Sequence, residues 1–383
     1  MENLQSKSNK ILFIDVATSG IAGCYADKYF NALNTDSNIE VVVSYYFPYN
    51  YGYKFFYRYS DLAASNKLHK FELLRLAIRL IEMFIGFTLI VKLMYRSKYD
   101  KVIYALSTNL KIEYFFLFFI KNIFKINLYI IAHDVIPFVF SFENLNKKIK
   151  QRKKFFLLSD KIIIHNNSSL ADLIKIYSIN EDKILTLKFP LYNLDQKLIY
   201  NEKITDYIDS KYLLFIGHLR EEKGVDFLLE VWKSVVHVNK DFKLVIAGRI
   251  PRGSKMSITD FEIENVVFLN KYVNDITFKS LIDNSAAVLL PYKRATNSAV
   301  LYSILTRIKP VILSDIPVFN ENLLIDKSLM FRNLDHEDFF QKILFFFSLK
   351  NDDKESLKIT LTNKILAYDK SFNIELNSML NKK

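Results

Sequence analysis

The chain has 383 residues, half of them hydrophobic, and a formal net charge of +12. This length and apolar content allow two domains with cores of their own, and they exclude a disordered tail or a small disulfide-stapled scaffold. The single cysteine, Cys24, excludes an internal disulfide and a thiolate metal site, which favours a reducing compartment.

In the first half of the chain, short β-branched segments alternate with helical segments. The strand-like segments are, in order, ILFIDVA, IEVVVSYYF, KVIYAL, INLYIIAHD, KIIIHN and ILTLKF. Nearly continuous hydrophobic strands separated by helices indicate a parallel sheet covered on both faces. We therefore expect a Rossmann-like α/β domain over residues 1–198, with a polar linker that starts at Pro190.

The most apolar stretch, residues 73–98, is interrupted by Arg75, Arg79, Glu82 and Lys92. It lacks the ~18 to 20 uncharged residues that a membrane-spanning helix needs. The polar N-terminus has no apolar core and does not fit a secretory signal. We expect a cytoplasmic protein without a transmembrane helix.

Positive charge is concentrated in the first half. Residues 1–200 hold 27 Lys and Arg against 17 Asp and Glu, a balance of +10, whereas the remainder holds 26 against 24, a balance of +2. Six of these cations lie within eight positions: Lys147, Lys148, Lys150, Arg152, Lys153 and Lys154. Such a cluster can bind an anionic membrane at ~1 kcal/mol per residue, bind nucleic acid, or form a solvated helix face. No zinc-finger, RRM-like or KH-like pattern accompanies it, so we favour the inner face of a membrane and expect no nucleic-acid partner.

The second half repeats the alternation. Its strand-like segments are YLLFIGH, FKLVIAG, NVVFL, AAVLLPY and PVILSD, separated by segments of helical spacing. We expect a second doubly wound domain over residues 199–365. Ligands of open α/β sheets bind beyond the carboxyl ends of the strands, so an active site is expected in a cleft that the two domains face.

One strand-to-helix turn, LLFIGHLREEKGVDFLL, stands out. It uses Gly217 and Gly224, two of only eight glycines, on either side of Arg220 and Lys223. Free amides at the start of a helix attract an anion, and the two cations add charge-assisted donors. A surface loop with solvated charges is the alternative.

Other strand-end residues are candidates of less specific kinds. Gly20, Gly23 and Gly248 also follow strands, and each allows either a close approach to a phosphate or sugar or simply a tight turn. The full G-x-G-x-x-G spacing is absent, so we expect no dinucleotide cofactor. His133 and Asp134 end a buried strand, where a histidine can bind a hydroxyl, move a proton, or be structural.

The polar residues Thr296, Asn297 and Ser298 precede a helix, and they can bind phosphate or sugar oxygens or only cap that helix. Glu321 follows a strand and can accept hydrogen bonds from sugar hydroxyls. There is no Asp-x-Asp in the strand-end loops and no cluster of His and carboxylates for a divalent metal. The charge of a leaving phosphate would then be stabilised by Arg220 and Lys223.

In combination these segments resemble the retaining GT-B glycosyltransferases of the group 1 type, which use nucleotide sugars. The matching segments, in family order, are SGIAGC, HDVIP, LLFIGHLREEKGVDFLL, FKLVIAG, VVFLNKYV, LLPYKRATNSAVLYSIL, KPVILSDIPVFNE and FNIELNSML. The resemblance implies an acceptor-binding first domain, a donor-binding second domain, and a C-terminal helix over 366–383 that crosses back to the first.

The resemblance also implies roles for individual residues. Arg220 and Lys223 look like the pair that binds the donor diphosphate, and His133 looks like the catalytic histidine near the donor sugar. The implied substrate-binding residues are Ser19, Gly20, Asp134, Gly217, Thr296, Asn297, Ser298 and Glu321.

Three positions depart from the family pattern. His218 stands where many members have arginine, and Ala295 and Ser303 stand where many have paired glutamates, the second of which usually binds the ribose. The segment ATNSAV instead resembles a branch of the family that reads Ala-Thr-x-Ser-Gly-Val, with Ala299 in place of the glycine.

The function implied is metal-independent, retaining transfer of a sugar from a nucleoside diphosphate sugar to a membrane-associated or polysaccharide acceptor, as in surface polysaccharide, capsule or lipopolysaccharide synthesis. The nucleotide sugar is a co-substrate, and no other cofactor is implied. The alternative is a catalytically inactive GT-B scaffold or partner subunit of another transferase, which the departures at His218, Ala295 and Ser303 favour.

Overall fold

A computed structural model describes residues 10–16, 23–33, 38–43, 54–55, 72–106, 111–137, 142–191, 212–251, 254 and 256–381. The chain folds into two compact units. Unit 1 comprises Met1–Pro190 and Ser371–Lys383, and unit 2 comprises Leu191–Lys370. The division lies at Pro190, where the linker was expected to start, rather than at residue 198.

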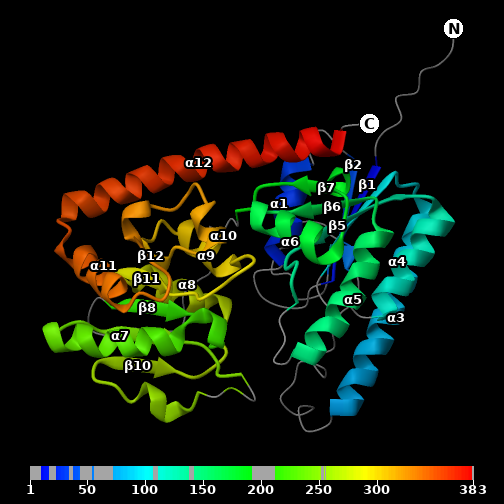
Figure 1. The fold of residues 1–383 in the computed structure, drawn as a ribbon. Helices are drawn as coiled ribbons and strands as arrows, with labels where there is room; N and C mark the ends of the chain where they lie inside the picture. The colour runs from blue at the N-terminus through cyan, green and yellow to red at the C-terminus, as the bar shows by residue number, and fades with distance from the viewer. Residues whose placement is uncertain are drawn as a thin grey trace. The chain divides into compact units, whose positions relative to one another are not determined.

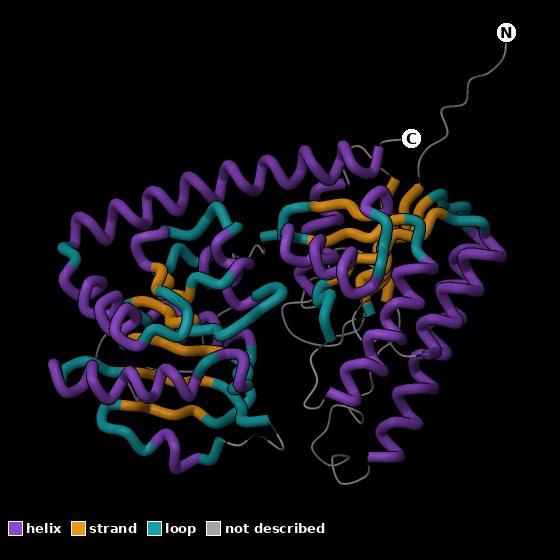
Figure 2. Tube along the Cα trace, viewed as in Figure 1, coloured by secondary structure: helices purple, strands orange, loops and turns teal. Residues whose placement is uncertain are grey.

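Unit 1 is built on a seven-stranded parallel sheet of order β3-β2-β1-β4-β5-β6-β7 (Figures 1 and 2). Its strands are β1 (Lys10–Asp15), β2 (Asn38–Val43), β3 (Lys54–Phe55), β4 (Lys101–Leu106), β5 (Asn127–Ala132), β6 (Lys161–Ile164) and β7 (Ile184–Thr186). Nearly every described side chain of β1, β5 and β6 is buried. A sheet covered on both faces explains why these strands read as continuous hydrophobic runs.

Helices cover both faces of this sheet. They are α1 (Gly23–Leu33), α3 (Glu72–Arg96), α4 (Lys111–Phe124), α5 (Phe142–Leu158) and α6 (Asn167–Tyr177), and a 3-10 turn, η3, spans Glu181–Lys183. Helices α3 to α6 share one core with alternate residues of the strands, including Leu12, Tyr104 and Ile130. Tyr29 of α1 packs against a residue near the C-terminus instead. Its ring centroid lies 6.0 Å from that of Phe372.

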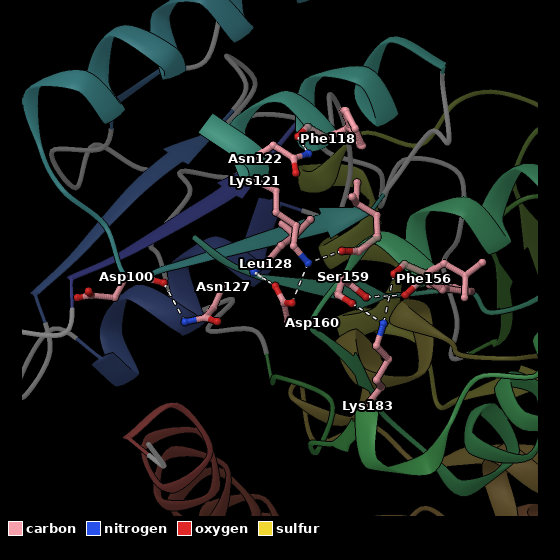
Figure 3. A network of polar contacts seen from close by, with 12 residues as sticks. Asp100, Phe118, Lys121, Asn122, Asn127, Leu128, Phe156, Ser159, Asp160 and Lys183 are labelled. Carbon is pink, nitrogen blue, oxygen red and sulfur yellow. Dashed lines mark hydrogen bonds and ion pairs between the residues drawn. The ribbon is translucent and has the colours of Figure 1, made fainter. Parts of the chain in front are cut away.

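Polar contacts fasten α4 and α5 to the edge of the sheet where β5 and β6 begin (Figure 3). The carboxylate of Asp160 accepts hydrogen bonds from Lys121 Nζ and from the Leu128 amide, both at 2.7 Å. Lys121 Nζ also donates to the Leu158 carbonyl at 2.7 Å, and Lys183 Nζ donates to the Ser159 carbonyl at 2.8 Å. The C-terminal ends of both helices are therefore tied to the strands beside them.

Unit 2 contains a six-stranded parallel sheet of order β10-β9-β8-β11-β12-β13. Its strands are β8 (Leu213–Ile216), β9 (Leu244–Ala247), β10 (Val266–Leu269), β11 (Ala287–Leu290), β12 (Val311–Ser314) and β13 (Met330–Phe331). Its helices are α7 (Val225–Val238), α8 (Asp275–Asn284), α9 (Ala299–Leu305), α10 (Pro317–Asn320), α11 (His336–Ser348) and α12 (Asn351–Asn381), with 3-10 turns η5 (Glu221–Lys223), η6 (Ile258–Phe261) and η7 (Lys327–Leu329). Helices α7 and α11 pack through Phe227 and Phe339, whose rings stack at 5.6 Å.

Helix α12 begins at Asn351, well before residue 366, and its last part belongs to unit 1. There Phe372, Leu376 and Leu380 are fully buried. Lys101 Nζ donates to the Leu380 carbonyl, and Asn377 donates to the Ala32 carbonyl at 3.1 Å. The C-terminal residues thus complete the core of the first unit.

The strand predictions are confirmed: each of the eleven strand-like segments contains a strand of the structure. The two strands that were missed, β3 and β13, have two residues each and are too short to carry an alternation. None of the helices within the described part of the chain combines the length and apolar composition needed to cross a bilayer.

Candidate functional site

The strand order of unit 2 reverses at β8. Strand β8 pairs with β9 on one side and with β11 on the other. The connections that follow β8 and β11 therefore lead in opposite directions, and open α/β sheets bind ligands in the crevice expected at the carboxyl ends of strands at such a point. The predicted anion-binding turn and the segment KRATNSAV both lie there.

Two glycines bring the backbone together at this edge. Gly217, directly after β8, has φ +136°, a conformation that side chains rarely adopt. A Cβ on Gly248, after β9, would lie 1.8 Å from the Gly217 carbonyl oxygen. Gly248 therefore allows two backbone turns to pack closely. Of the two roles predicted for this residue, this is the structural one.

Gly224 has a similar role at the start of α7. It is left-handed, with φ +67°, and its added Cβ would lie 1.9 Å from the Pro291 carbonyl oxygen. The Lys293 amide donates to the Glu222 carbonyl at 2.9 Å, which ties the two loops a second time. The Gly224 amide donates to the Glu221 carbonyl at 3.1 Å, and the Lys223 amide donates to the Arg220 carbonyl at 2.9 Å. The expectation of free amides at this helix start is therefore wrong for these two residues.

Arg220 and Lys223 are held in different ways. Arg220 is about one third exposed at its side chain, 35%, and its Nη1 lies 3.6 Å from Glu222 Oε1. Lys223 Nζ lies 3.7 Å from the centroid of the Tyr292 ring, an arrangement that favours the cation. Burial and then the charges of Arg220 and Lys223 lower the pKa of His218. The Arg220 and Lys223 side chains therefore form one positively charged group beside the neutral imidazole of His218.

The start of α9 lies beside this group. Val300 of α9 approaches the open side of Gly217, 3.8 Å from the position of its missing Cβ. Ser298 is buried, and its hydroxyl oxygen caps α9 by accepting from the Leu301 amide at 3.2 Å. Thr296 and Asn297 lie half-buried in the loop between β11 and α9. The structure thus places these three residues in the same crevice as Gly217, with Ser298 in a capping role.

Of the three positions that depart from the family pattern, Ser303 lies on α9. Ser303 is fully buried, and its hydroxyl donates to the Ala299 carbonyl at 2.9 Å, so it points into the core instead of replacing a ribose-binding glutamate.

Its neighbour Tyr302 was not predicted. Burial raises the pKa of Tyr302 to about 12, a side-chain hydrogen bond with Tyr368 opposes the increase, and the charge of Glu321 adds to it. The spacing of Tyr302 four residues after Ser298 could have identified it as lying on the face of α9 below the cap.

Tyr292 is the other residue that the sequence analysis missed. It is buried and lies directly beyond β11, with its ring beneath the Lys223 ammonium group. The backbone carbonyl of Tyr292 accepts from the Ser314 hydroxyl at 2.6 Å, which ties the Tyr292 backbone to β12. An aromatic residue at a strand end in the segment LLPY was the signal available in the sequence.

In unit 1, His133 and Asp134 follow β5 as predicted. His133 is half-buried, and burial, then the charge of Arg152, lowers its pKa to about 4. Its ring centroid lies 6.5 Å from that of His165, whose Nδ1 is 3.0 Å from the Leu187 carbonyl oxygen. Burial lowers the pKa of His165 to about 3. Both rings are therefore neutral near pH 7, and each can donate or accept a hydrogen bond without carrying charge.

Arg152 corrects one part of the predicted basic surface. Its side chain is buried, donates to the Asp134 carbonyl, and donates to the Val135 carbonyl at 3.2 Å. Tyr177 donates to the same Val135 carbonyl at 2.7 Å. Arg152 thus supports the turn after β5 and is not available to a membrane, whereas Lys147, Lys148, Lys150 and Lys154 are exposed and Lys153 is half-buried.

Two further predictions concern Ser19 with Gly20 and the absence of a metal site. Ser19 and Gly20 lie outside the described residues. Within the described ranges, no group of three or more His, Cys, Asp or Glu side chains is placed to hold a metal ion.

Comparisons with known proteins agree with this arrangement. Residues 210–348 match the family model described as Glycosyl transferases group 1. An uncharacterized glycosyltransferase of Methanocaldococcus jannaschii is 24% identical over 169 residues, which are 41% of this chain and 43% of the relative. The chain thus matches less than half the length of that curated relative.

Several solved structures resemble the whole chain. S. aureus TarM, solved with UDP among its ligands, has 14% identity and a TM-score of 0.67 over 98% of this chain and 100% of its own. Sucrose-phosphate synthase of Thermosynechococcus elongatus has 11% identity and a TM-score of 0.65 over 97% and 98%. Anabaena HepE, solved with UDP-glucose, has 11% identity and a TM-score of 0.62 over the same shares. These likenesses establish the fold.

Proposed function

We propose that this chain is a retaining, metal-independent glycosyltransferase, because residues 210–348 match the glycosyl transferases group 1 model and the chain has the GT-B fold. Its donor is a nucleoside diphosphate sugar bound by unit 2. Its acceptor is a membrane-associated or polysaccharide glycan, at the cytoplasmic face of a membrane.

One observation carries the proposal: Arg220 and Lys223 lie in the turn after β8, and Lys223 Nζ lies 3.7 Å from the ring of Tyr292 in the loop after β11. A diphosphate carries its negative charge on oxygens that a guanidinium fork and an ammonium group can both approach. The cation–π contact with Tyr292 fixes Lys223 before the donor arrives. Preorganised cations of this kind stabilise charge that develops on a leaving group.

The proposed reaction is a front-face displacement. The bond between the anomeric carbon and the diphosphate oxygen breaks with both electrons going to the oxygen, and the acceptor hydroxyl oxygen bonds to the same face of that carbon. The acceptor proton passes to the departing diphosphate. Arg220 and Lys223 stabilise the negative charge of the departing diphosphate, a role that a divalent metal ion would otherwise fill.

His133 and Glu321 are assigned to the sugar. The neutral His133 imidazole binds a donor-sugar hydroxyl without adding charge near the anomeric centre. The Glu321 carboxylate, whose charge raises the pKa of Tyr302, accepts from sugar hydroxyls. Because Ser303 is buried, we assign the ribose to other groups of this loop, with Thr296 and Asn297 as the candidates.

Calorimetric titration of the full chain with UDP, GDP and their sugars tests the donor assignment. UDP is the first nucleotide to try, because TarM and HepE were solved with UDP and UDP-glucose. We expect one nucleotide to bind and Arg220→Ala to weaken it, while Lys240→Ala, an exposed lysine with its side chain 76% accessible, leaves it unchanged. Turnover that survives EDTA would support metal independence.

The same titration decides between the enzyme and the inactive scaffold. The buried Ser303 in place of the ribose-binding glutamate is the observation that favours a scaffold. Failure of every UDP and GDP species to bind would favour that alternative.

A further inference from the structure

The outward faces of α3 and α4 carry large apolar side chains in solvent. On α3, Phe84 is 67% exposed and Ile81 is 60% exposed, and on α4, Phe115 is 66% exposed. Among the described side chains of these two helices, the exposed large apolar ones are Leu74, Leu80, Ile81, Phe84, Ile85, Leu89, Tyr95, Phe115, Phe118, Phe119 and Ile123. Single exposed apolar residues are ordinary, but a contiguous group of this size marks an interaction surface.

Helix α4 shows why these residues are not an extension of the core. Its inner face, Phe116, Leu117 and Ile120, is buried against the sheet. Its outer residues recur at helical spacing and form a second apolar stripe. A helix that is apolar all round is normally buried all round, so the outer stripe of α4 lacks the cover that its composition calls for.

The three helices form one continuous layer. Phe87 of α3 stacks on Phe116 of α4 at 4.0 Å, and Tyr114 of α4 meets Phe155 of α5 edge-on at 5.6 Å. In Figure 1 they run side by side over the same face of the unit 1 sheet. Their outward faces therefore make up a single surface, fixed to the sheet by Lys121 and Asp160 (Figure 3).

The charges on this layer have one sign. The exposed charged residues with described side chains on α3, α4 and α5 are Lys92, Arg96, Lys111, Lys147, Lys148, Lys150 and Lys154. The acidic residues with described side chains on these helices, Glu82 and Glu113, are buried. Among the described side chains the surface thus presents apolar groups bordered by cations and no exposed carboxylate.

We propose that this surface binds an anionic lipid bilayer, with the aromatic and aliphatic side chains of α3 and α4 in the interfacial region and the α5 lysines on the headgroups. Helices that lie in the plane of a membrane combine these two features. A second copy of the chain fits the surface less well, because its cations would face the same cations, and no exposed carboxylate among the described side chains of these helices could pair with them. The inference rests on the surface alone and does not depend on sugar transfer.

Co-sedimentation of the full chain with vesicles tests the proposal. Vesicles of phosphatidylcholine with phosphatidylserine should bind the chain, and vesicles of phosphatidylcholine alone should bind it much more weakly. Phe115→Ser with Phe119→Ser should reduce binding at least about tenfold, because both rings leave the interface. Lys147→Ala with Lys150→Ala should reduce it by about fivefold per lysine at low salt.

Matched variants in unit 2 serve as controls. Phe345→Ser changes an exposed aromatic residue, and Lys233→Ala with Lys240→Ala removes two exposed lysines; neither change should alter vesicle binding. Unchanged thermal unfolding of the α4 variant would show that its fold is retained. Nucleotide titration of the same variant separates this surface from the donor site.

Two results would overturn the proposal. One is vesicle binding that is equal with and without phosphatidylserine, or equal for the α4 variant and the unchanged chain. The other is a self-association in sedimentation velocity that Phe115→Ser with Phe119→Ser abolishes while no vesicle binds, which would assign the surface to a second copy.

Discussion

At the scale of single residues, Lys223 and Arg220 place positive charge in one turn, but their side chains are held by different contacts. The Lys223 ammonium group lies over the Tyr292 ring, whereas Arg220 faces Glu222 at 3.6 Å and keeps about a third of its side chain in solvent. The Arg220 Nη1 to Glu222 Oε1 separation of 3.6 Å is longer than a hydrogen bond, so this contact is an ion pair without a hydrogen bond.

Replacing either cation should lower turnover more than it lowers stability. If each stabilises charge in the transition state, Arg220→Ala and Lys223→Ala should each reduce kcat by ~10² to 10³. Donor-dependent transfer assays with Lys240→Ala as the control measure this. Unchanged turnover in the double variant would remove both residues from the mechanism.

Two histidines of unit 1 with lowered pKa values predict how its stability depends on pH. Both His133 and His165 have folded-state pKa values lowered from 6.5, to about 4 and about 3. Below pH 6.5 the unfolded chain binds protons that the folded chain does not, so this stability is complete above pH 6.5 and is lost as the pH falls toward 4 and 3. At pH 5 the loss should reach up to ~2 kcal/mol per histidine.

Denaturant unfolding at pH 7.5 and pH 5, followed by a probe in unit 1, measures this slope. His165→Asn keeps an amide donor for the Leu187 carbonyl and should flatten the slope. A slope that is the same in the variant would show that His165 does not carry the effect.

At the scale of elements, the turn between β8 and α7 depends on Gly224. An alanine there would have a left-handed backbone and a Cβ 1.9 Å from the Pro291 carbonyl oxygen. The backbone strain alone costs ~1 to 2 kcal/mol, and the clash forces the two loops apart. Gly224→Ala should therefore lower both stability and nucleotide affinity, measured by denaturant unfolding and calorimetry; unaltered values for both would contradict the packing described here.

Asp160 connects α4 to the start of β5 in the sheet of unit 1. Asp160→Ala removes the acceptor of the Lys121 ammonium group and of the Leu128 amide. Loss of hydrogen bonds to a charged group typically costs ~1.5 to 3 kcal/mol each, and partial exposure of the pair places the expected loss toward the lower end. Asp182→Ala, an exposed aspartate in η3, is the control for unfolding measurements, and equal stability of the two variants would show that the network in Figure 3 is dispensable.

At the scale of the whole molecule, the chain returns to its first unit at its C-terminus. Leu376 is fully buried in unit 1, whereas Leu366 on the same helix is 65% exposed. Leu376→Ala should cost ~2 to 5 kcal/mol of unit 1 stability, as core truncations do, and Leu366→Ala should cost little. Hydrogen exchange of β1 and β4 peptides would detect the loss, and protection unchanged by Leu376→Ala would show that the C-terminal segment is not part of this core.

Much of the fold could be predicted from local patterns. The strands of both sheets are continuous apolar runs between helices of 3.6-residue period, and burial on both faces of a parallel sheet produces that pattern directly. The turn with Arg220 and Lys223 was predictable for a similar reason, because a strand, two glycines and a helix lie within one short segment. The contact of Lys223 with Tyr292 was not, since the two residues come from different loops.

By itself, the sequence determined the two doubly wound sheets, the order of the family segments and the positions of the candidate cations, because each depends on residues close together in the chain. Only the tertiary structure decided which way individual side chains turn. It buried Arg152 among backbone carbonyls, turned Ser303 into the core, and left one stripe of α4 uncovered. The reason is physical: a side chain is buried or exposed according to what packs against its face of the helix, and those neighbours come from distant parts of the chain.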